Sequence, residues 1–268
     1  MADDEEVGSG TRAVMWKRLA AVAVMVTAAS LLLSHVLGGG GAGPAATAVP
    51  PAVVQPHGPP LVMPKAPAGS TLVATVHASI PGYSAPQASR PSLTIEPTWH
   101  GEPAALPVIW ASRGWVDVRL PQRPNGLTAW VKDTDVTFSS TPYKILVDLA
   151  TRQLIVFKDL RLAAAFPAGI GTVADPTPTG QFFVAFFAAP PSPGYGPFVL
   201  VSSAHSNTIS DWESSGDALM AIHGPLGEDS AIGTTGAQIS HGCVRLHVAD
   251  LEQLRGIPAG SPIVVVAS

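Results

Sequence analysis

From Thr71 to the C-terminus the apolar residues come in short runs, and glycine, proline or other turn residues separate these runs. Runs of this length and composition favour β-strands and leave little room for long helices. The first block, residues 71–139, contains the runs TLVATV, LPVIWA, GWVDVRL and LTAWVKDTDVTF. The pair Asn125-Gly126 between the last two runs is typical of a hairpin turn. We therefore predict a small β-barrel or sandwich domain over this block.

The second block, residues 141–268, is predicted to contain further strands and one helix. The stretch YKILVDLATRQLIVFKD predicts two strands around a turn at 150–152, and the other predicted strands are RLAAAFPAGIG, GQFFVAFFA, GPFVLVSSA and, closing the sheet, SPIVVVAS. A helix is predicted from Val248 to Arg255, because Leu251 and Leu254 share one of its faces. The predicted fold class is mostly β, with a mainly antiparallel sheet and one or two short helices.

The N-terminal part has the pattern of a membrane anchor. Residues 1–18 are polar and end with the basic pair Lys17-Arg18, and residues 19–37 contain no formally charged side chain. As a helix, this apolar segment would span about 28 Å, close to the thickness of a bilayer core. Basic residues in front of such a span place that side in the cytoplasm. The sequence predicts a cytoplasmic tail and one transmembrane anchor, with cleavage of a signal segment near Ala48 as the alternative.

A linker rich in glycine, alanine and proline, residues 38–70, follows the apolar segment. Its composition buries too little apolar surface to fold, and its prolines keep it extended. The folded part is therefore predicted to lie in the cell envelope, outside the cytoplasmic membrane, anchored by a single pass or, alternatively, secreted. The formal net charge of −4 and the lack of a long basic run argue against nucleic acid as a partner.

Cys243 is the only cysteine, so the chain cannot form an internal disulfide. It ends the sequence Ser240-His241-Gly242-Cys243, and His223 lies seventeen residues before Ser240. A nearby imidazole lowers the pKa of a thiol and takes its proton. Gly242 allows a tight turn, which would let the amide of Cys243 face an oxyanion. The pattern predicts a cysteine nucleophile, and the alternative is a buried, inert cysteine.

These motifs resemble the signature of the L,D-transpeptidases, also called YkuD-type domains: His-Gly, a gap, then Ser/Thr-His-Gly-Cys, an apolar residue and Arg or Asn. The chain has His223-Gly224 and then SHGCVR from Ser240 to Arg245. The resemblance covers about Pro142 to Ala267 through the segments VDLATRQLIVFKD, ADPTPTGQFFV, YGPFVLVSSAHS, AIHG and VADLEQL. The stretch GWVDVRLPQRPNGLTAWVKDTDVTF is similar to the small Src-homology-type β domain that precedes many actinobacterial cell-wall enzymes.

The resemblance implies a role for each residue of the signature. Cys243 is implied as the nucleophile and His223 as its base, with the backbone carbonyl of Gly224 orienting the imidazole. His241 is nearest in sequence to the thiol and is the rival base, but the resemblance favours His223.

Further residues are expected around the cleft. Ser240 and Gly242 are expected to shape the loop that carries the thiol and its oxyanion site. Arg245 is expected to bind a substrate carboxylate or, alternatively, to brace the loop. Tyr195 and His205 are candidates for the lining of the cleft, and for His205 an ordinary polar role is the favoured alternative.

Three tryptophans of the first block are interpreted as core or half-core residues in preference to a platform for sugar or peptide: Trp110, Trp115 and Trp130. We expect Trp115 and Trp130 in particular to fill the core of the small β domain.

The implied reaction is acyl transfer between peptidoglycan stem peptides. The thiolate attacks the peptide bond before the terminal D-alanine of a tetrapeptide stem, and an amine of a neighbouring stem takes the acyl group. Carbapenem-type inhibitors are expected to acylate the thiol, and no cofactor is implied. Alternatives are an L,D-carboxypeptidase that uses water, a non-catalytic wall-binding protein, and a zinc enzyme using His223, His241 and Cys243.

Overall fold

The computed structural model describes residues 65–233 and 235–267. The predicted anchor at 19–37, the cleavage site near Ala48 and most of the predicted linker lie outside these residues. None of the helices in the described ranges has both the length and the apolar character that crossing a membrane requires.

A five-stranded sheet with the order β8-β7-β6-β1-β9 forms the first block. Two strand pairs, β2 with β3 and β4 with β5, accompany it. The bounds are β1 (Thr71–Val76), β2 (Ile80–Gly82), β3 (Leu93–Ile95), β4 (Thr98–Trp99), β5 (Glu102–Pro103), β6 (Ala105–Ser112), β7 (Trp115–Arg119), β8 (Thr128–Lys132), the 3-10 turn η1 (Asp133–Asp135) and β9 (Val136–Thr141). Closure of this sheet into a barrel stays a prediction.

The predicted hairpin at Asn125-Gly126 is confirmed, because β7 and β8 pair antiparallel on either side of it. Gly126 has a φ of 87°, in the left-handed region that glycine adopts without strain. The connection is longer than a two-residue turn, since the ladder ends where the Leu120 amide donates to the Leu127 carbonyl at 2.9 Å.

The tryptophans of β7 and β8 are half-buried and do not fill the core, which corrects the expectation that Trp115 and Trp130 do so. Side chains alternate between the two faces of a strand, and the core face of β7 belongs to Val116 and Val118, both fully buried. Trp115 lies on the other face, where its ring meets the edge of Tyr83 at 5.1 Å. Trp130 follows the same alternation in β8, and Trp110 is 66% exposed.

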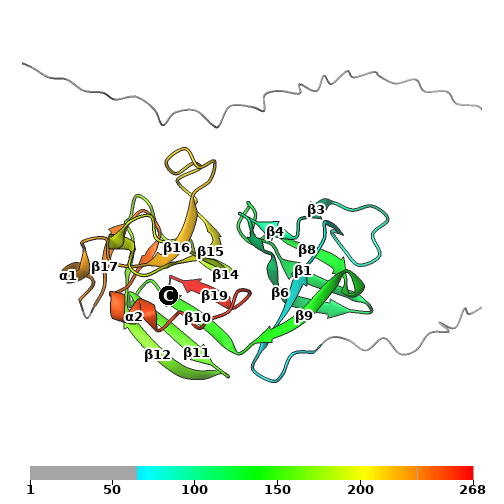
Figure 1. Cartoon of the computed structure of the whole chain (residues 1–268), viewed down its shortest axis with the longest axis horizontal. Coiled ribbons are helices and arrows are strands. Elements are labelled where there is room, and N and C mark those ends of the chain that lie inside the picture. The colour runs from blue at the N-terminus through cyan, green and yellow to red at the C-terminus, as the bar shows by residue number, and fades with distance from the viewer. Residues whose placement is uncertain (1–64, 234, 268) are drawn as a thin grey trace, which may run out of the picture. The chain divides into compact units, whose positions relative to one another are not determined.

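The second block forms a ten-stranded sheet with the order β12-β11-β10-β19-β14-β15-β16-β18-β13-β17 (Figure 1). Its bounds are β10 (Tyr143–Asp148), β11 (Gln153–Lys158), β12 (Arg161–Pro167), β13 (Gly169–Gly171), β14 (Gly180–Ala188), η2 (Pro193–Tyr195), β15 (Val199–His205), β16 (Leu219–His223), β17 (Ala237–Ser240), β18 (Val244–Arg245) and β19 (Pro262–Val266). This confirms the mostly β class. The last strand, β19, does not close an edge but lies between β10 and β14, parallel to β10.

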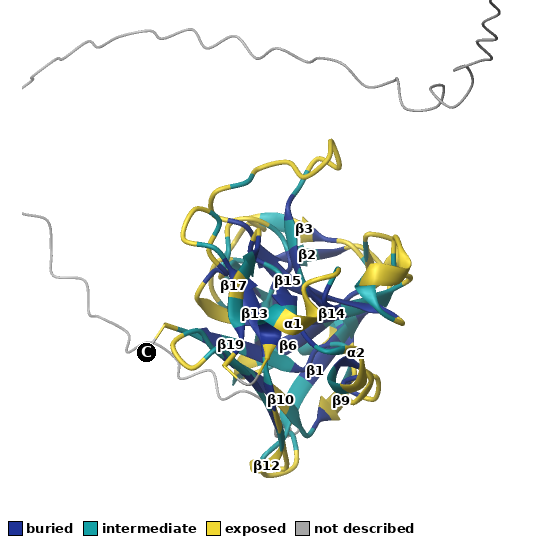
Figure 2. Cartoon of the chain, turned by 90° about the vertical axis from the view of Figure 1, so that its left-hand side faces the viewer, coloured by how far each residue is buried: buried dark blue, intermediate teal, exposed yellow. Residues whose placement is uncertain are grey.

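Two short α-helices complete the second block: α1 (Asp229–Ile232) and α2 (Val248–Glu252). The predicted helix 248–255 is right in position but three residues too long, because turns replace helix after Glu252. Leu251 and Leu254 are nevertheless both fully buried in the core of this sheet, as the apolar pattern predicted. Buried positions gather on the strands, and the loops carry most of the exposed ones (Figure 2).

The strand β14 is buried on both faces, which explains why GQFFVAFFA is almost continuously apolar. Phe182 and Val184 pack into the core of the ten-stranded sheet. Phe183 and Ala185 point the other way and belong to the core of the five-stranded sheet. The described residues of both sheets therefore form one compact unit.

Candidate active site

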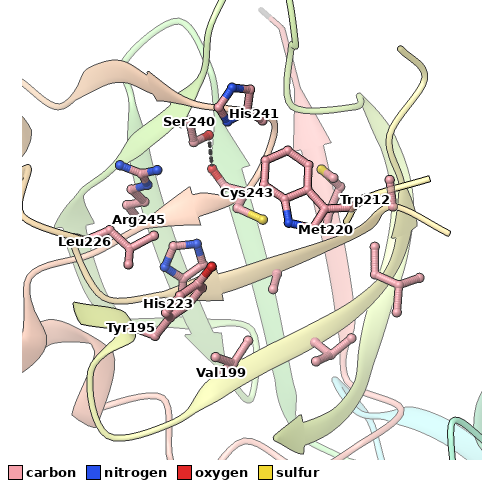
Figure 3. A pocket seen from close by; sticks show the side chains of 14 residues that line it. Tyr195, Val199, Trp212, Met220, His223, Leu226, Ser240, His241, Cys243 and Arg245 are labelled. Atoms are coloured by element: carbon pink, nitrogen blue, oxygen red, sulfur yellow. Dashed lines mark hydrogen bonds between the residues drawn. The ribbon is translucent and has the colours of Figure 1, made fainter. Parts of the chain in front are cut away.

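Parallel pairing of β16 with β18 brings the two halves of the cysteine–histidine motif together. Ile222 pairs with Val244, and His223 pairs with Arg245. Because His223 ends β16 and Cys243 immediately precedes β18, the imidazole and the thiol lie on neighbouring strands. Figure 3 shows both side chains directed toward one cavity.

The cavity has a volume of about 250 Å³. Apart from the glycines, all but one of the side chains that were candidates for the cleft line this cavity, together with several aliphatic residues. The aromatic, polar, charged and sulfur-containing lining residues are Tyr195, Trp212, Met220, His223, Ser240, His241, Cys243 and Arg245. The arrangement is a mainly apolar pocket with a few converging polar groups, as small-molecule and peptide sites commonly are.

His223 is buried and has a fixed orientation. Its Nδ1 lies 2.8 Å from the carbonyl oxygen of Gly224, an acceptor, so Nδ1 carries the proton and Nε2 is left to accept one. Burial, together with the positive charge of Arg245, lowers the pKa of His223 to about 4, although the Gly224 carbonyl opposes the shift. The imidazole is therefore neutral at neutral pH and available as a base.

Gly224 is required at its position by close packing of the backbone. Its N–H donates to the carbonyl oxygen of Tyr195 at 2.7 Å. A Cβ at this position would lie 2.8 Å from the Tyr195 carbonyl carbon and 2.9 Å from the Gly196 nitrogen. The same contact brings the Tyr195 ring to 4.7 Å from the His223 ring, so this glycine couples two walls of the cavity.

Cys243 is half-buried, and burial raises the pKa of its thiol, while a hydrogen bond with the Ala221 backbone and the charge of Arg245 act in the opposite direction. This corrects the expectation that a neighbouring imidazole lowers the thiol pKa. A neutral His223 supplies no positive charge to stabilise a thiolate. The resting site therefore holds a neutral thiol beside a neutral imidazole.

The turn that carries the thiol is held by Ser240. The Ser240 hydroxyl accepts from the Gly242 N–H at 3.1 Å and donates to the Cys243 carbonyl at 2.5 Å. Gly242 has a φ of 114°, and a Cβ there would lie 2.5 Å from the sulfur of Met220. Both residues thus fix the direction in which Cys243 enters the cavity.

His241 lies at the rim of the cavity with 60% of its side chain exposed. Its Nε2 is 4.0 Å from a carboxylate oxygen of Asp175, and its ring is 5.1 Å from that of Trp212. The rival base therefore sits in a solvated position, whereas His223 is buried and oriented.

Arg245 contributes a cation to the cavity wall. Its Nε is buried and has no hydrogen-bond partner within the described part of the chain. A buried cationic donor without a partner is costly, so the site favours an anionic ligand. Tyr195 faces the same region, and burial, followed by the negative charge of an ionised Cys243, raises its pKa.

His205 does not line the cavity, which leaves the favoured alternative from the sequence, an ordinary polar residue. Only 1% exposed, it lies 2.6 Å from the Pro121 carbonyl oxygen through Nε2 and 2.9 Å from Asp217 through Nδ1. Trp212 and Met220 do line it, and sequence reasoning missed both. The one sequence signal that could have identified Trp212 is its position as a single aromatic residue within the polar stretch SDWESSGD.

Among residues 65–233 and 235–267, no three His, Cys, Asp or Glu side chains group as ligands for a metal ion. The fold and the cavity define a β-sheet domain with a thiol and an oriented imidazole at the ends of adjacent strands.

Residues 142–265 match the family model of the YkuD L,D-transpeptidase catalytic domain. This part of the chain is therefore similar to the YkuD type of domain, in agreement with the resemblance of its motifs. The chain is 31% identical over 123 residues to a putative L,D-transpeptidase YkuD of Bacillus licheniformis, covering 46% of this chain and 64% of the relative. It is 26% identical over 125 residues to the Bacillus subtilis counterpart, covering 46% and 66%. The chain thus spans just under two thirds of the length of these relatives.

Two solved structures are also similar to the chain. An L,D-transpeptidase from Mycobacterium smegmatis has a TM-score of 0.37 and 18% identity, and the match covers 57% of this chain and 91% of that one. The LD transpeptidase LdtMt1 in complex with imipenem has a TM-score of 0.38 and 19% identity, with 73% and 82% covered.

Proposed function

We propose that the protein is a peptidoglycan L,D-transpeptidase in which Cys243 transfers an acyl group between stem peptides. The donor is a tetrapeptide stem that loses its terminal D-alanine, and the acceptor is an amine of a neighbouring stem. One observation carries the proposal: Cys243 shares a cavity with a buried imidazole whose Nδ1 is bound to the Gly224 carbonyl, so that its Nε2 can accept the thiol proton. The match of residues 142–265 to the catalytic domain model supports it.

The first half-reaction forms a thioester. The sulfur of Cys243 attacks the carbonyl carbon before the terminal D-alanine, while Nε2 of His223 takes the thiol proton. The Gly242 N–H is already used by Ser240, so we assign the adjacent Cys243 N–H to the oxyanion. When the C–N bond breaks, His223 returns the proton to the leaving amine, and D-alanine departs with its pair of electrons on nitrogen.

The second half-reaction regenerates the thiol. An amine attacks the thioester carbon, His223 takes a proton from its nitrogen, and the C–S bond breaks. The sulfur then recovers the proton from His223. If water replaces the amine, the same steps give an L,D-carboxypeptidase, and which acceptor is used depends on access to the cavity.

Neutral partners suit this mechanism. With a pKa of about 4, His223 stays unprotonated through the neutral range. The Cys243 thiol has a raised pKa and stays protonated until a substrate enters the cavity and displaces its water. The proton then moves during the attack and not before it. Such a thiol is also less exposed to oxidation at rest, since the thiolate is the form that oxidants attack.

We assign the carboxylate of the terminal D-alanine to Arg245. This residue follows Cys243 by two positions and lines the same cavity, and its buried Nε has no hydrogen-bond partner among residues 65–233 and 235–267. The assignment makes a free carboxylate next to the cleaved bond a requirement for the donor. Carbapenems also carry a carboxylate, which supports the expectation that they acylate Cys243.

The working site is proposed to lie in the cell envelope, where its substrate is, with the N-terminal segment serving as a membrane anchor. A non-catalytic wall-binding role is the alternative, and the product analysis described next separates this role from the transpeptidase activity.

The test is a product analysis with the purified protein, a defined tetrapeptide stem and a second stem as acceptor. Mass spectrometry is expected to detect released D-alanine, a transient thioester on Cys243 and a cross-linked dimer. Cys243→Ala is the control and should form none of them. Stems recovered intact, with no adduct on the wild-type protein, would point to the wall-binding alternative.

Replacing Arg245 by glutamine is expected to raise KM for the tetrapeptide by roughly ten- to a hundredfold, because a hydrogen-bonded ion pair with the substrate is lost. The variant Arg255→Gln is a matched control, since Arg255 pairs with Glu252 on the surface, away from the cavity. A tetrapeptide that ends in a carboxamide lacks the carboxylate and should react slowly with the wild-type protein. Arg245→Gln should not slow the reaction of this carboxamide any further. If Arg245→Gln still discriminates fully against the carboxamide, another group binds the carboxylate.

A further inference from the structure

We infer that Arg123 and Asn125, in the β7–β8 connection of the five-stranded sheet, are positioning residues for the active site. They bind both ends of the loop 206–218, which we call the Trp212 loop, and thereby fix one wall of the cavity around Cys243. The inference rests on the proposed function for its kinetic readout only.

Arg123 joins the beginning of the Trp212 loop to its end. Its Nε lies 2.9 Å from a carboxylate oxygen of Asp217, Nη1 donates to the Ser206 carbonyl at 2.8 Å, and Nη2 donates to the Ile209 carbonyl at 3.0 Å. All three nitrogens of the planar guanidinium are used, a geometry that a lysine cannot reproduce.

Asn125 binds the strand end from which the loop departs. Its Nδ2 donates to the His205 carbonyl at 2.8 Å, and its Oδ1 accepts from the His205 N–H at 2.9 Å. The side-chain amide thus pairs with the backbone of β15 as a neighbouring strand would. The buried His205 ring adds a bond to the Pro121 carbonyl and another to Asp217.

The loop residues that Arg123 and Asn125 bind are adjacent in sequence to residues that line the cavity. Ala218 and Leu219, which follow Asp217, line the cavity, as does Trp212 in the middle of the loop. The Trp212 N–H donates to the Asp217 carbonyl at 2.8 Å, and Ser206 N–H donates to the Ala218 carbonyl at 2.8 Å. The direction of the loop therefore depends on where Asp217 and Ser206 are held.

The tip of the loop is hydrogen-bonded within the loop, since the Gly216 N–H donates to an Asp211 carboxylate oxygen at 2.8 Å. Trp212 is 39% exposed, and its ring lies 5.1 Å from that of the exposed His241. Neither Arg123 nor Asn125 lines the cavity. Their effect on the reaction must therefore pass through the loop, which makes the five-stranded sheet part of the active-site support.

The experiment compares Arg123→Ala with Arg119→Ala in the full chain. Arg119 is a matched control because its Nη2 also donates to the other sheet, to Gln181 Oε1 at 3.1 Å, but does not touch the Trp212 loop. Each variant is measured for KM and kcat with the tetrapeptide and for the rate at which iodoacetamide alkylates Cys243. Thermal melting reports the loss of stability in both.

Arg123→Ala is expected to raise KM and the alkylation rate by about three- to tenfold, with a smaller change in kcat, while Arg119→Ala stays within about twofold of wild type. Arg123→Lys should recover the melting temperature more than the KM, since it restores the charge but not the three hydrogen bonds. If Arg123→Ala does not fold, Asp217→Asn provides the same comparison from within the loop.

Equal KM and equal alkylation rates for the Arg123 and Arg119 variants, at any melting temperature, would overturn the inference and leave Arg123 a purely structural contact. A wild-type protein that turns over no stem peptide would contradict the proposed function instead. The alkylation rates would then still decide the positioning role.

Discussion

Replacing His223 by alanine is expected to slow acylation of Cys243 by about two to four orders of magnitude, the usual contribution of a positioned general base. The imidazole is buried, neutral and oriented by the Gly224 carbonyl, and the thiol has a raised pKa, so few thiols ionise without help. The rate is measured by intact-protein mass spectrometry as a carbapenem or a tetrapeptide donor adds to Cys243.

His241→Gln is the matched control, because it removes the other imidazole of the motif from an exposed rim position. This variant should stay within about tenfold of wild type, since the loss affects contacts at the rim and not proton transfer. Comparable losses in the two variants, with unchanged melting temperatures, would contradict the assignment of His223 as the base.

Acylation is expected to be level through the neutral range and to fall as the pH drops through about 4, where His223 becomes protonated. Burial lowers the pKa of this imidazole, so the active neutral form persists well below the ordinary histidine value of about 6.5. At the alkaline end, the rate of iodoacetamide labelling should keep rising beyond the ordinary thiol pKa of about 8.5, because burial disfavours the thiolate.

Measurement of kcat/KM and of labelling across pH 3.5 to 10 would check both limbs, with circular dichroism at each pH to exclude unfolding. A fall in kcat/KM centred at a pH of about 6.5 would indicate an unperturbed imidazole. Labelling that is already complete at neutral pH would indicate a thiolate–imidazolium pair, and the neutral resting state would then be wrong.

The turn that carries Cys243 was predictable from the sequence, because the residues that shape it are close together in the chain. Ser240, Gly242 and Cys243 form a single turn whose hydrogen bonds lie within four residues. The pairing of His223 with this turn followed from the family resemblance and is realised by two parallel strands. The raised thiol pKa was not predictable, since it depends on how much protein surrounds Cys243.

Other errors come from pairings that are distant in sequence. A strand pattern with period two does not say which face meets the core, so Trp115 was assigned to the face that Val116 and Val118 occupy. His205 was one candidate for the cleft, but the connection containing Pro121 reaches it from the other sheet. The central place of β19 likewise requires the strands on both sides to be known.

The two-faced strand β14 has a consequence for how the molecule unfolds. Its alternate side chains, Phe182 and Phe183, are each anchored in a different core. Removal of either sheet would leave a stripe of aromatic surface open to water and would weaken the remaining one. Cooperativity is therefore expected to extend across both sheets. The melting temperature of the half that carries the candidate active site then depends on the neighbouring sheet, although Cys243 and His223 both lie outside that sheet.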